Sequence, residues 1–141
     1  MRPISHTLID SIRAPIEEVF AVLTEPARIA LWLPGCDGVD CEAPLKKGTR
    51  IKVRFGARVT EFEVVDFNPP VTFGWVERGA RKGWKTFFRL DATGAATAVT
   101  IRYAWIPRSP VAWARGRLFE KRKVERQLGA ILENLRNILT P

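Results

Sequence analysis

The chain has 141 residues, of which 46% are hydrophobic, and it carries a formal net charge of +8. This length and apolar content suit a single domain over residues 1–141 with its own core, and they exclude an intrinsically disordered chain. The positive charge favours solubility and weak attraction to polyanions, but it specifies neither a fold nor a partner.

The content of histidine and cysteine argues against a metal site. There is one histidine, and the two cysteines are Cys36 and Cys41. A structural zinc site normally needs four such ligands, so we expect no metal. Glycine-rich phosphate loops and nucleophile-elbow motifs are also missing, and no cofactor is expected. Reduced thiols, without a signal-peptide pattern or an apolar run of membrane-spanning length, predict a cytoplasmic protein.

The N-terminal part predicts a strand followed by two short helices. Residues 4–12 are expected to form the strand. Apolar residues recur at helical spacing in 15–23, and Pro15 suits a first helical position because no N–H is needed there. Thr24 is expected to cap the second helix, and the Leu-Pro-Gly sequence at 33–35 to end it.

A hairpin with a defined register follows. Apolar and basic residues alternate in 49–55, and Gly56-Ala57 suits a two-residue turn. This turn places apolar residues opposite apolar ones and basic residues opposite acidic ones. The predicted pairs are 55 with 58, 51 with 62, 52 with 61 and 50 with 63.

Three more alternating strands follow the break at Asn68-Pro69-Pro70. Each is expected to turn a row of large side chains toward the interior. The rows are Phe73 and Trp75, then Trp84, Thr86, Phe88 and Leu90, and finally Val99, Ile101, Tyr103 and Trp105.

The chain ends in a long predicted helix over roughly 110–139. Its later part carries an apolar stripe at helical spacing, made of Val124, Leu128, Ile131, Leu135 and Ile138. Its early part holds bulky residues in a less regular order, so we expect only the later part to dock tightly. The early part is expected to cover an opening.

Five segments in order resemble the START-like superfamily, most closely its polyketide cyclase/dehydrase and lipid-transport branch. They are APIEEVF, TEPARIALWLPG, KKGTRIKV, GAATAVTIRY and ILENLR. The resemblance implies an α+β helix-grip fold, in which a curved antiparallel sheet of about seven strands surrounds a long C-terminal helix. Two short helices follow the first strand, and a cavity lies between the sheet and the long helix.

An aromatic lining is predicted for this cavity, which suits a hydrophobic or amphipathic small molecule of lipid or polyketide type. In the alternative interpretation these rings simply fill the core. The predicted ligand-binding residues are Trp32, Leu33, Phe55, Phe73, Trp75, Trp84, Phe88, Tyr103, Trp105, Trp113, Leu118 and Phe119.

The alternative function is that of an enzyme similar to polyketide aromatases and cyclases. Tyr103, His6 and Arg54 are the candidates for its polar contacts. Tyr103 is expected to carry its hydroxyl on the cavity face, and His6 titrates near neutral pH. The commoner role of such residues is structural, with Tyr103 as a buried tyrosine that has a hydrogen-bond partner and His6 as a surface or hydrogen-bonded histidine.

A basic run between residues 108 and 126 suggests a third function, that of an interaction module. It could contact an anionic membrane surface or an acidic partner through the C-terminal helix, or it could be a solvated helix face. Nucleic-acid binding is not expected, because no aromatic residues are interleaved on an exposed basic face. The sequence does not indicate the oligomeric state.

Overall fold

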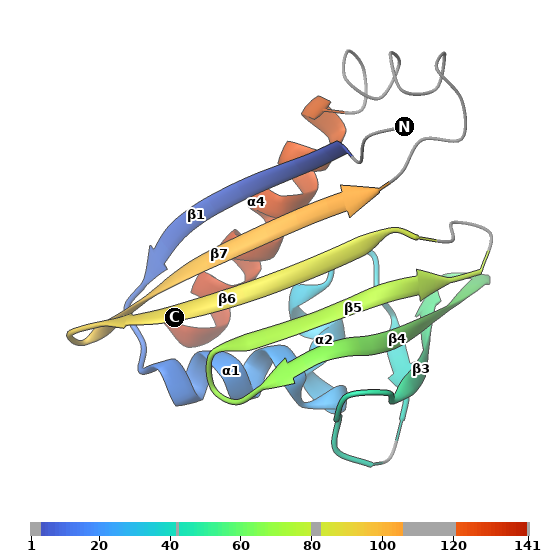
Figure 1. Ribbon diagram of the computed structural model, residues 1–141, viewed down its shortest axis with the longest axis horizontal. Coiled ribbons are helices and arrows are strands. Elements are labelled where there is room, and N and C mark those ends of the chain that lie inside the picture. Colours follow the sequence, from blue (N-terminus) through green and yellow to red (C-terminus); the bar gives the residue numbers. More distant parts are fainter. Residues whose placement is uncertain (1–3, 42, 80–82, 106–120, 141) are drawn as a thin grey trace.

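The computed structural model describes residues 4–41, 43–79, 83–105 and 121–140. Its seven strands form one curved antiparallel sheet in the order β1-β7-β6-β5-β4-β3-β2 (Figure 1). The predicted helix-grip fold is confirmed. The strands are β1 (Ile4–Ile12), β2 (Gly38–Asp40), β3 (Arg50–Phe55), β4 (Arg58–Asn68), β5 (Thr72–Arg78), β6 (Lys85–Thr93) and β7 (Ala96–Trp105).

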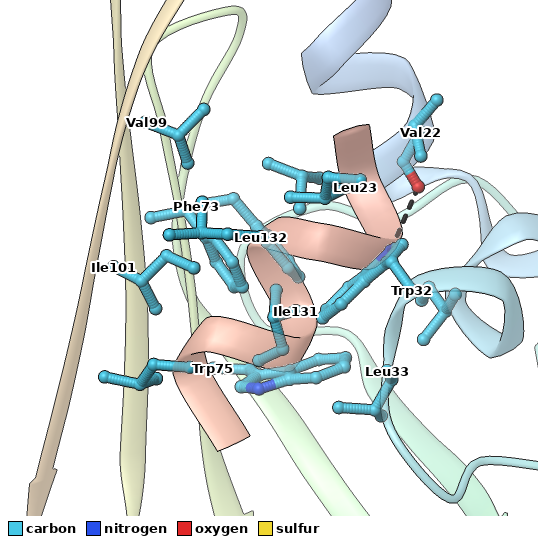
Figure 2. Close-up of a cluster of buried hydrophobic side chains, with 14 of the residues drawn as sticks. Val22, Leu23, Trp32, Leu33, Phe73, Trp75, Val99, Ile101, Ile131 and Leu132 are labelled. Carbon is cyan, nitrogen blue, oxygen red and sulfur yellow. Dashed lines mark hydrogen bonds between the residues drawn. The ribbon is translucent and has the colours of Figure 1, made fainter. Parts of the chain in front are cut away.

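Two short helices, α1 (Ile16–Thr24) and α2 (Pro26–Trp32), link β1 to β2. Where they meet, a proline leaves one carbonyl without its helical donor. The carbonyl of Val22 would accept a bond from residue 26, but Pro26 has no N–H. The indole Nε1 of Trp32 donates to this carbonyl instead, at 3.1 Å (Figure 2). This bond fixes the position of the Trp32 ring at the end of α2.

The prediction that Thr24 caps α2 is wrong. Thr24 is the last residue of α1, and its hydroxyl donates to the carbonyl of Phe20 at 2.8 Å. Pro26 takes the first position of α2 and thereby makes Glu25 the N-cap. The predicted end of this helix is confirmed, with Leu33 as the C-cap.

The hairpin of β3 and β4 has the predicted register. Ile51 lies opposite Phe62, and Arg50 lies opposite Glu63. The guanidinium of Arg50 forms exposed ion pairs with Glu61 and Glu63, at 3.3 and 3.5 Å. The turn places Gly56 at a φ of 63°, a conformation that glycine adopts without steric cost.

The C-terminal helix α4 (Lys121–Leu139) packs its apolar stripe inward. Four members of the predicted stripe are buried, Ile138 is half-buried, and Leu132 is buried beside them. The predicted segment 110–120 lies outside the described residues. α4 contacts β1 and β7 on one side and α1 and α2 on the other. Ile131 and Leu132 belong to the same buried cluster as Phe73 and Trp75 of the sheet and Leu23 of α1 (Figure 2).

No helix in the described ranges is both long and apolar enough to cross a membrane.

Candidate functional site

A cavity of about 330 Å³ lies between the sheet, the end of α2 and α4. This volume is at the lower end of the range of roughly 300–1,000 Å³ that is typical of small-molecule pockets. Strands β3 to β7 and the two helices all contribute to its walls. The lining residues are Trp32, Leu33, Pro34, Gly35, Phe55, Arg58, Phe62, Trp75, Glu77, Trp84, Thr86, Tyr103, Gln127, Leu128 and Ile131.

One wall of the cavity is a set of packed rings. The rings of Phe62 and Trp75 have centroids 4.5 Å apart, and those of Trp32 and Trp75 stack at 5.8 Å. Trp32 and Trp75 are almost completely buried. Ile131 of α4 faces these rings (Figure 2). Because the rings hold one another in place, this wall is a rigid apolar surface.

Another part of the lining is polar, and the sheet register explains how it forms. Tyr103 of β7 lies opposite Thr86 of β6, and Thr86 lies opposite Trp75 of β5. Glu77 follows Trp75 at strand spacing, and its N–H donates to the carbonyl of Trp84 at 2.8 Å. These residues share one face, so they place a phenol, a hydroxyl and a carboxyl group on the inner side of the sheet.

Arg58 provides the positive charge of the lining. It comes directly after the β3–β4 turn and lies opposite Phe55 in the register. Its guanidinium carbon lies 5.0 Å from the centroid of the Phe55 ring, within cation–π distance. The lining thus combines aromatic and aliphatic side chains with one acidic and one basic side chain.

Of the twelve predicted ligand-binding residues, six line this cavity: Trp32, Leu33, Phe55, Trp75, Trp84 and Tyr103. Phe73 and Phe88 do not belong to the lining. They are 0% and 1% exposed and stack on each other, with centroids 5.9 Å apart. Their rings fill the core, as the alternative interpretation expected for part of the set.

Trp105 is not part of the lining. Its ring stacks on Trp84, with centroids 4.6 Å apart. Trp113, Leu118 and Phe119 lie outside the described residues, so their place at the cavity stays a prediction.

Of the three candidates for polar contacts, only Tyr103 lies on the cavity wall. Arg54 forms an ion pair with Asp40 of the neighbouring strand β2 and is not among the lining residues. The sequence placed Arg54 on the polar face of β3, and this ion pair agrees with that position.

His6 faces the inner side of the sheet but lies beyond the lining. Its ring centroid is 5.7 Å from that of Trp105, and its Nε2 atom is buried without a hydrogen-bond partner among the described residues. Burial lowers the pKa of His6 and is the largest effect. The charge of Glu125 raises this pKa, and the charge of Lys121 lowers it. The neutral imidazole is therefore favoured.

Seven lining residues on strands or on α4 were not predicted from the sequence. For several of them the signal was present: Phe62 and Arg58 share the strand parity of Val64, and Glu77 shares that of Trp75. On α4, Leu128 and Ile131 belonged to the predicted stripe. The seven are Arg58, Phe62, Glu77, Thr86, Gln127, Leu128 and Ile131.

The described residues do not form a metal site. No three His, Cys, Asp or Glu side chains among them are grouped so as to hold an ion. Both cysteines are free thiols. Burial raises the pKa of the Cys36 thiol, which disfavours the thiolate that nucleophilic or metal-binding chemistry would need.

The described part of the basic run is exposed. Lys121, Arg122, Lys123 and Arg126 at the start of α4 are all exposed, as is Glu125. Contact with an anionic surface through this helix stays a prediction.

Comparison with known proteins agrees with this architecture. A family profile described as polyketide cyclase/dehydrase and lipid transport matches residues 7–140. No curated protein matches the chain.

Several solved structures share the fold at low sequence identity. DynU16, from the dynemicin biosynthetic locus, is 22% identical with a TM-score of 0.72; the match covers 96% of this chain but 46% of DynU16. The Aha1 dimer from Colwellia psychrerythraea is 20% identical with a TM-score of 0.72, over 99% of this chain and 96% of that one. A protein from Arthrobacter aurescens is 12% identical with a TM-score of 0.75, over 96% and 86% of the two chains.

These identities establish the fold alone, whereas the profile spans nearly the whole sequence. Together with the seven-stranded sheet, the two short helices and the C-terminal helix, it shows that the chain belongs to the polyketide cyclase/dehydrase and lipid-transport family.

Proposed function

We propose that the chain binds a hydrophobic or amphipathic small molecule, of lipid or polyketide type, in the cavity between the sheet and α4. The observation that carries this proposal is the cavity of about 330 Å³, which three tryptophans line together with α4. A pocket that is mostly apolar with a few convergent polar groups is the usual form of a small-molecule site.

The distribution of polar groups favours an amphipathic ligand. The rings of Trp32, Phe62 and Trp75 offer a surface for an apolar body, while Tyr103 and Glu77 offer hydrogen-bonding groups. A hydroxyl or carbonyl group on the ligand could bond to Tyr103, since a phenol both donates and accepts.

A cavity-filling variant tests whether this cavity is the binding site. Anilinonaphthalene sulfonate, which becomes fluorescent in apolar surroundings, is the probe. Ile131→Phe enlarges a lining side chain and should weaken probe binding at least about tenfold, which corresponds to ~1.4 kcal/mol. Ile138→Phe makes the same change on the same helix at a half-buried residue outside the lining, so binding should be unchanged. Equal probe binding by both variants and the parent chain would contradict the proposal.

The identity of the ligand requires the protein from its own host. Native mass spectrometry of the gently purified chain should detect a bound lipid, pigment or polyketide as an added mass. The Ile131→Phe variant, purified in parallel, should lack that mass.

A second candidate function is ring closure in a polyketide-type chain. It is favoured by the presence of Tyr103 and Glu77 on the same cavity wall, because such a reaction needs a proton donor and a proton acceptor near one substrate. A linear poly-β-ketone thioester is the substrate probe, and mass spectrometry would follow the loss of water. Tyr103→Phe and Glu77→Gln should slow this loss and leave dye binding largely intact. Conversion at the uncatalysed rate would leave binding as the function.

A further inference from the structure

The two edges of the sheet differ greatly in length. The edge strand β2 spans three residues, Gly38–Asp40, whereas β1 at the other edge spans nine, Ile4–Ile12. A long edge strand presents a row of unpaired backbone groups, and proteins usually protect such an edge with lysine, proline, a bulge or a covering segment. β2 is protected by its shortness, whereas the length of β1 gives it no such protection.

Within the described ranges, few other features protect β1. Between Ile4 and Ile12 there is no proline, lysine or arginine, and Asp10 is the one charged residue. The side chains of Ser5, Thr7, Ile9 and Ser11 are exposed, and Ile9, at 65%, is the most exposed large hydrophobic residue in the described part of the chain.

The bonds of Ser11 show which backbone groups point away from β7. Its N–H donates to the Oδ1 atom of Asp10 at 2.8 Å, and its carbonyl accepts from Nη2 of Arg136 at 3.2 Å. Alternate residues of a strand direct their N–H and carbonyl groups to the same side. The outward backbone groups are therefore those of Ser5, Thr7, Ile9 and Ser11. Of these four residues, only Ser11 has backbone groups that bond to side chains of the described residues.

A groove runs beside this edge. It has a volume of about 420 Å³ and is bordered by Leu8, Ile9 and Asp10 of β1 and by α4 from Gly129 to Asn137. At Gly129 an added methyl group would meet no atom within 4 Å. The edge thus has free space next to it on the helix side.

We propose that two copies of this chain associate by pairing their β1 edges antiparallel, about a two-fold axis at Leu8. The sequence of β1 is complementary to itself in this register. Thr7 and Ile9 of one copy lie opposite the partner's Ile9 and the partner's Thr7, and Ser5 lies opposite the partner's Ser11. These are pairs of outward-facing residues, which can exchange backbone hydrogen bonds.

The remaining pairs also match in character. Ile4 lies opposite the partner's Ile12, and His6 lies opposite the partner's Asp10, which combines an imidazole with a carboxylate. A shift of the axis to Thr7 would place Ile4 opposite the partner's Asp10, and a shift to Ile9 would place Leu8 opposite the partner's Asp10. The axis at Leu8 pairs all nine residues and avoids both mismatches.

The central pairs require no rearrangement of existing bonds. At the ends, Ser11 would exchange its bonds to Asp10 and Arg136 for bonds to the partner's Ser5. The ion pair between Arg136 and Asp10 can remain, because it uses side-chain atoms only.

Light scattering and sedimentation over a wide range of protein concentration test the association. The parent chain should form a dimer, and Ile9→Lys should be monomeric at concentrations where the parent chain dimerises. Val59→Lys is the matched control, since Val59 is 55% exposed on β4, and it should dimerise as the parent chain does. A monomeric parent chain, or equal association of both variants and the parent chain, would overturn the proposal.

Disulfide trapping tests the register independently, in a chain with Cys36 and Cys41 replaced by serine. A Thr7→Cys chain mixed with an Ile9→Cys chain should form a cross-linked pair under mild oxidation. Each variant alone should cross-link far less. Two copies of residue 7 lie opposite each other only if the axis is at Thr7, and two copies of residue 9 only if it is at Ile9. Efficient cross-linking of one variant alone, or none in the mixture, would overturn the axis at Leu8.

Discussion

The rings of Trp84 and Trp105 lie face to face, with centroids 4.6 Å apart and planes inclined by only 8°. Trp84 is part of the cavity wall, whereas Trp105 is 5% exposed and does not line the cavity. His6 contacts the same Trp105 ring. Three neighbouring rings, of His6, Trp105 and Trp84, therefore lead from β1 to the cavity, and only the last of them lines it.

This difference predicts that two tryptophan substitutions affect stability and dye binding to different extents. Trp105→Ala removes a packed core ring and should lower the free energy of unfolding by ~3–5 kcal/mol. Trp84→Ala should lower it less, because Trp84 is half-buried, and should weaken dye binding more. Urea unfolding and dye titration measure both quantities. Equal effects of the two variants on both quantities would contradict this division of roles.

The bond between Trp32 and Val22 predicts a difference between two conservative changes. Trp32→Phe removes the donor and leaves the buried carbonyl of Val22 unpaired, at a cost of about 1–3 kcal/mol in addition to the lost ring volume. Trp75→Phe is the control, because Trp75 is as deeply buried as Trp32 and loses a ring of the same size, whereas the bond to Val22 belongs to Trp32. Urea unfolding should find Trp32→Phe the less stable of the two.

His6 predicts a dependence of stability on pH. Because burial lowers its pKa in the folded state, the unfolded chain takes up the proton at a higher pH. The free energy of unfolding should therefore fall as the pH drops below the ordinary value of 6.5, and this loss should stop below the folded-state pKa. Measurements on the Ile9→Lys chain would exclude effects of association.

His6→Gln in the same background is the control and should lack this slope. Asp10 does not interfere, because the hydrogen bond from Arg136 lowers its pKa and moves its own effect below pH 3.8. An unchanged slope after His6→Gln would assign the effect to other groups.

Replacing either of two glycines by alanine should change the free energy of unfolding, with opposite signs at Gly129 and Gly74. Gly129 lies inside α4 with no atom within 4 Å of an added Cβ, so Gly129→Ala should raise the free energy of unfolding by about 0.5–1 kcal/mol. At Gly74 a Cβ would collide with a ring carbon of Phe87, so Gly74→Ala should destabilise the sheet. Thermal unfolding compares the two, and stabilisation by both changes would contradict the packing at Gly74.

The sequence was most informative where two patterns had to agree. In the hairpin of β3 and β4, the turn at Gly56-Ala57 and the alternation on both sides allowed one register, and that register is observed. In α4, the apolar stripe identified the buried face. β2 was not located, because three residues are too few to show alternation.

The candidate site was harder to predict than the fold. Alternation shows which face of a strand points inward. It does not show whether an inward residue lies in the packed core or beside the cavity. Phe88 and Thr86 share one face of β6, yet Phe88 is packed in the core and Thr86 lines the cavity. Glu77 was overlooked although its parity matches that of Trp75, because a carboxylate is usually expected on the solvent side.

The placement of the indoles has a practical consequence. Three of the four tryptophans in the described ranges, Trp32, Trp75 and Trp84, border the same enclosed volume. Any guest that absorbs in the near ultraviolet would sit within energy-transfer range of all three. The intrinsic emission of the unlabelled protein is therefore a direct gauge of occupancy, suited to screening compounds whose identity is unknown in advance.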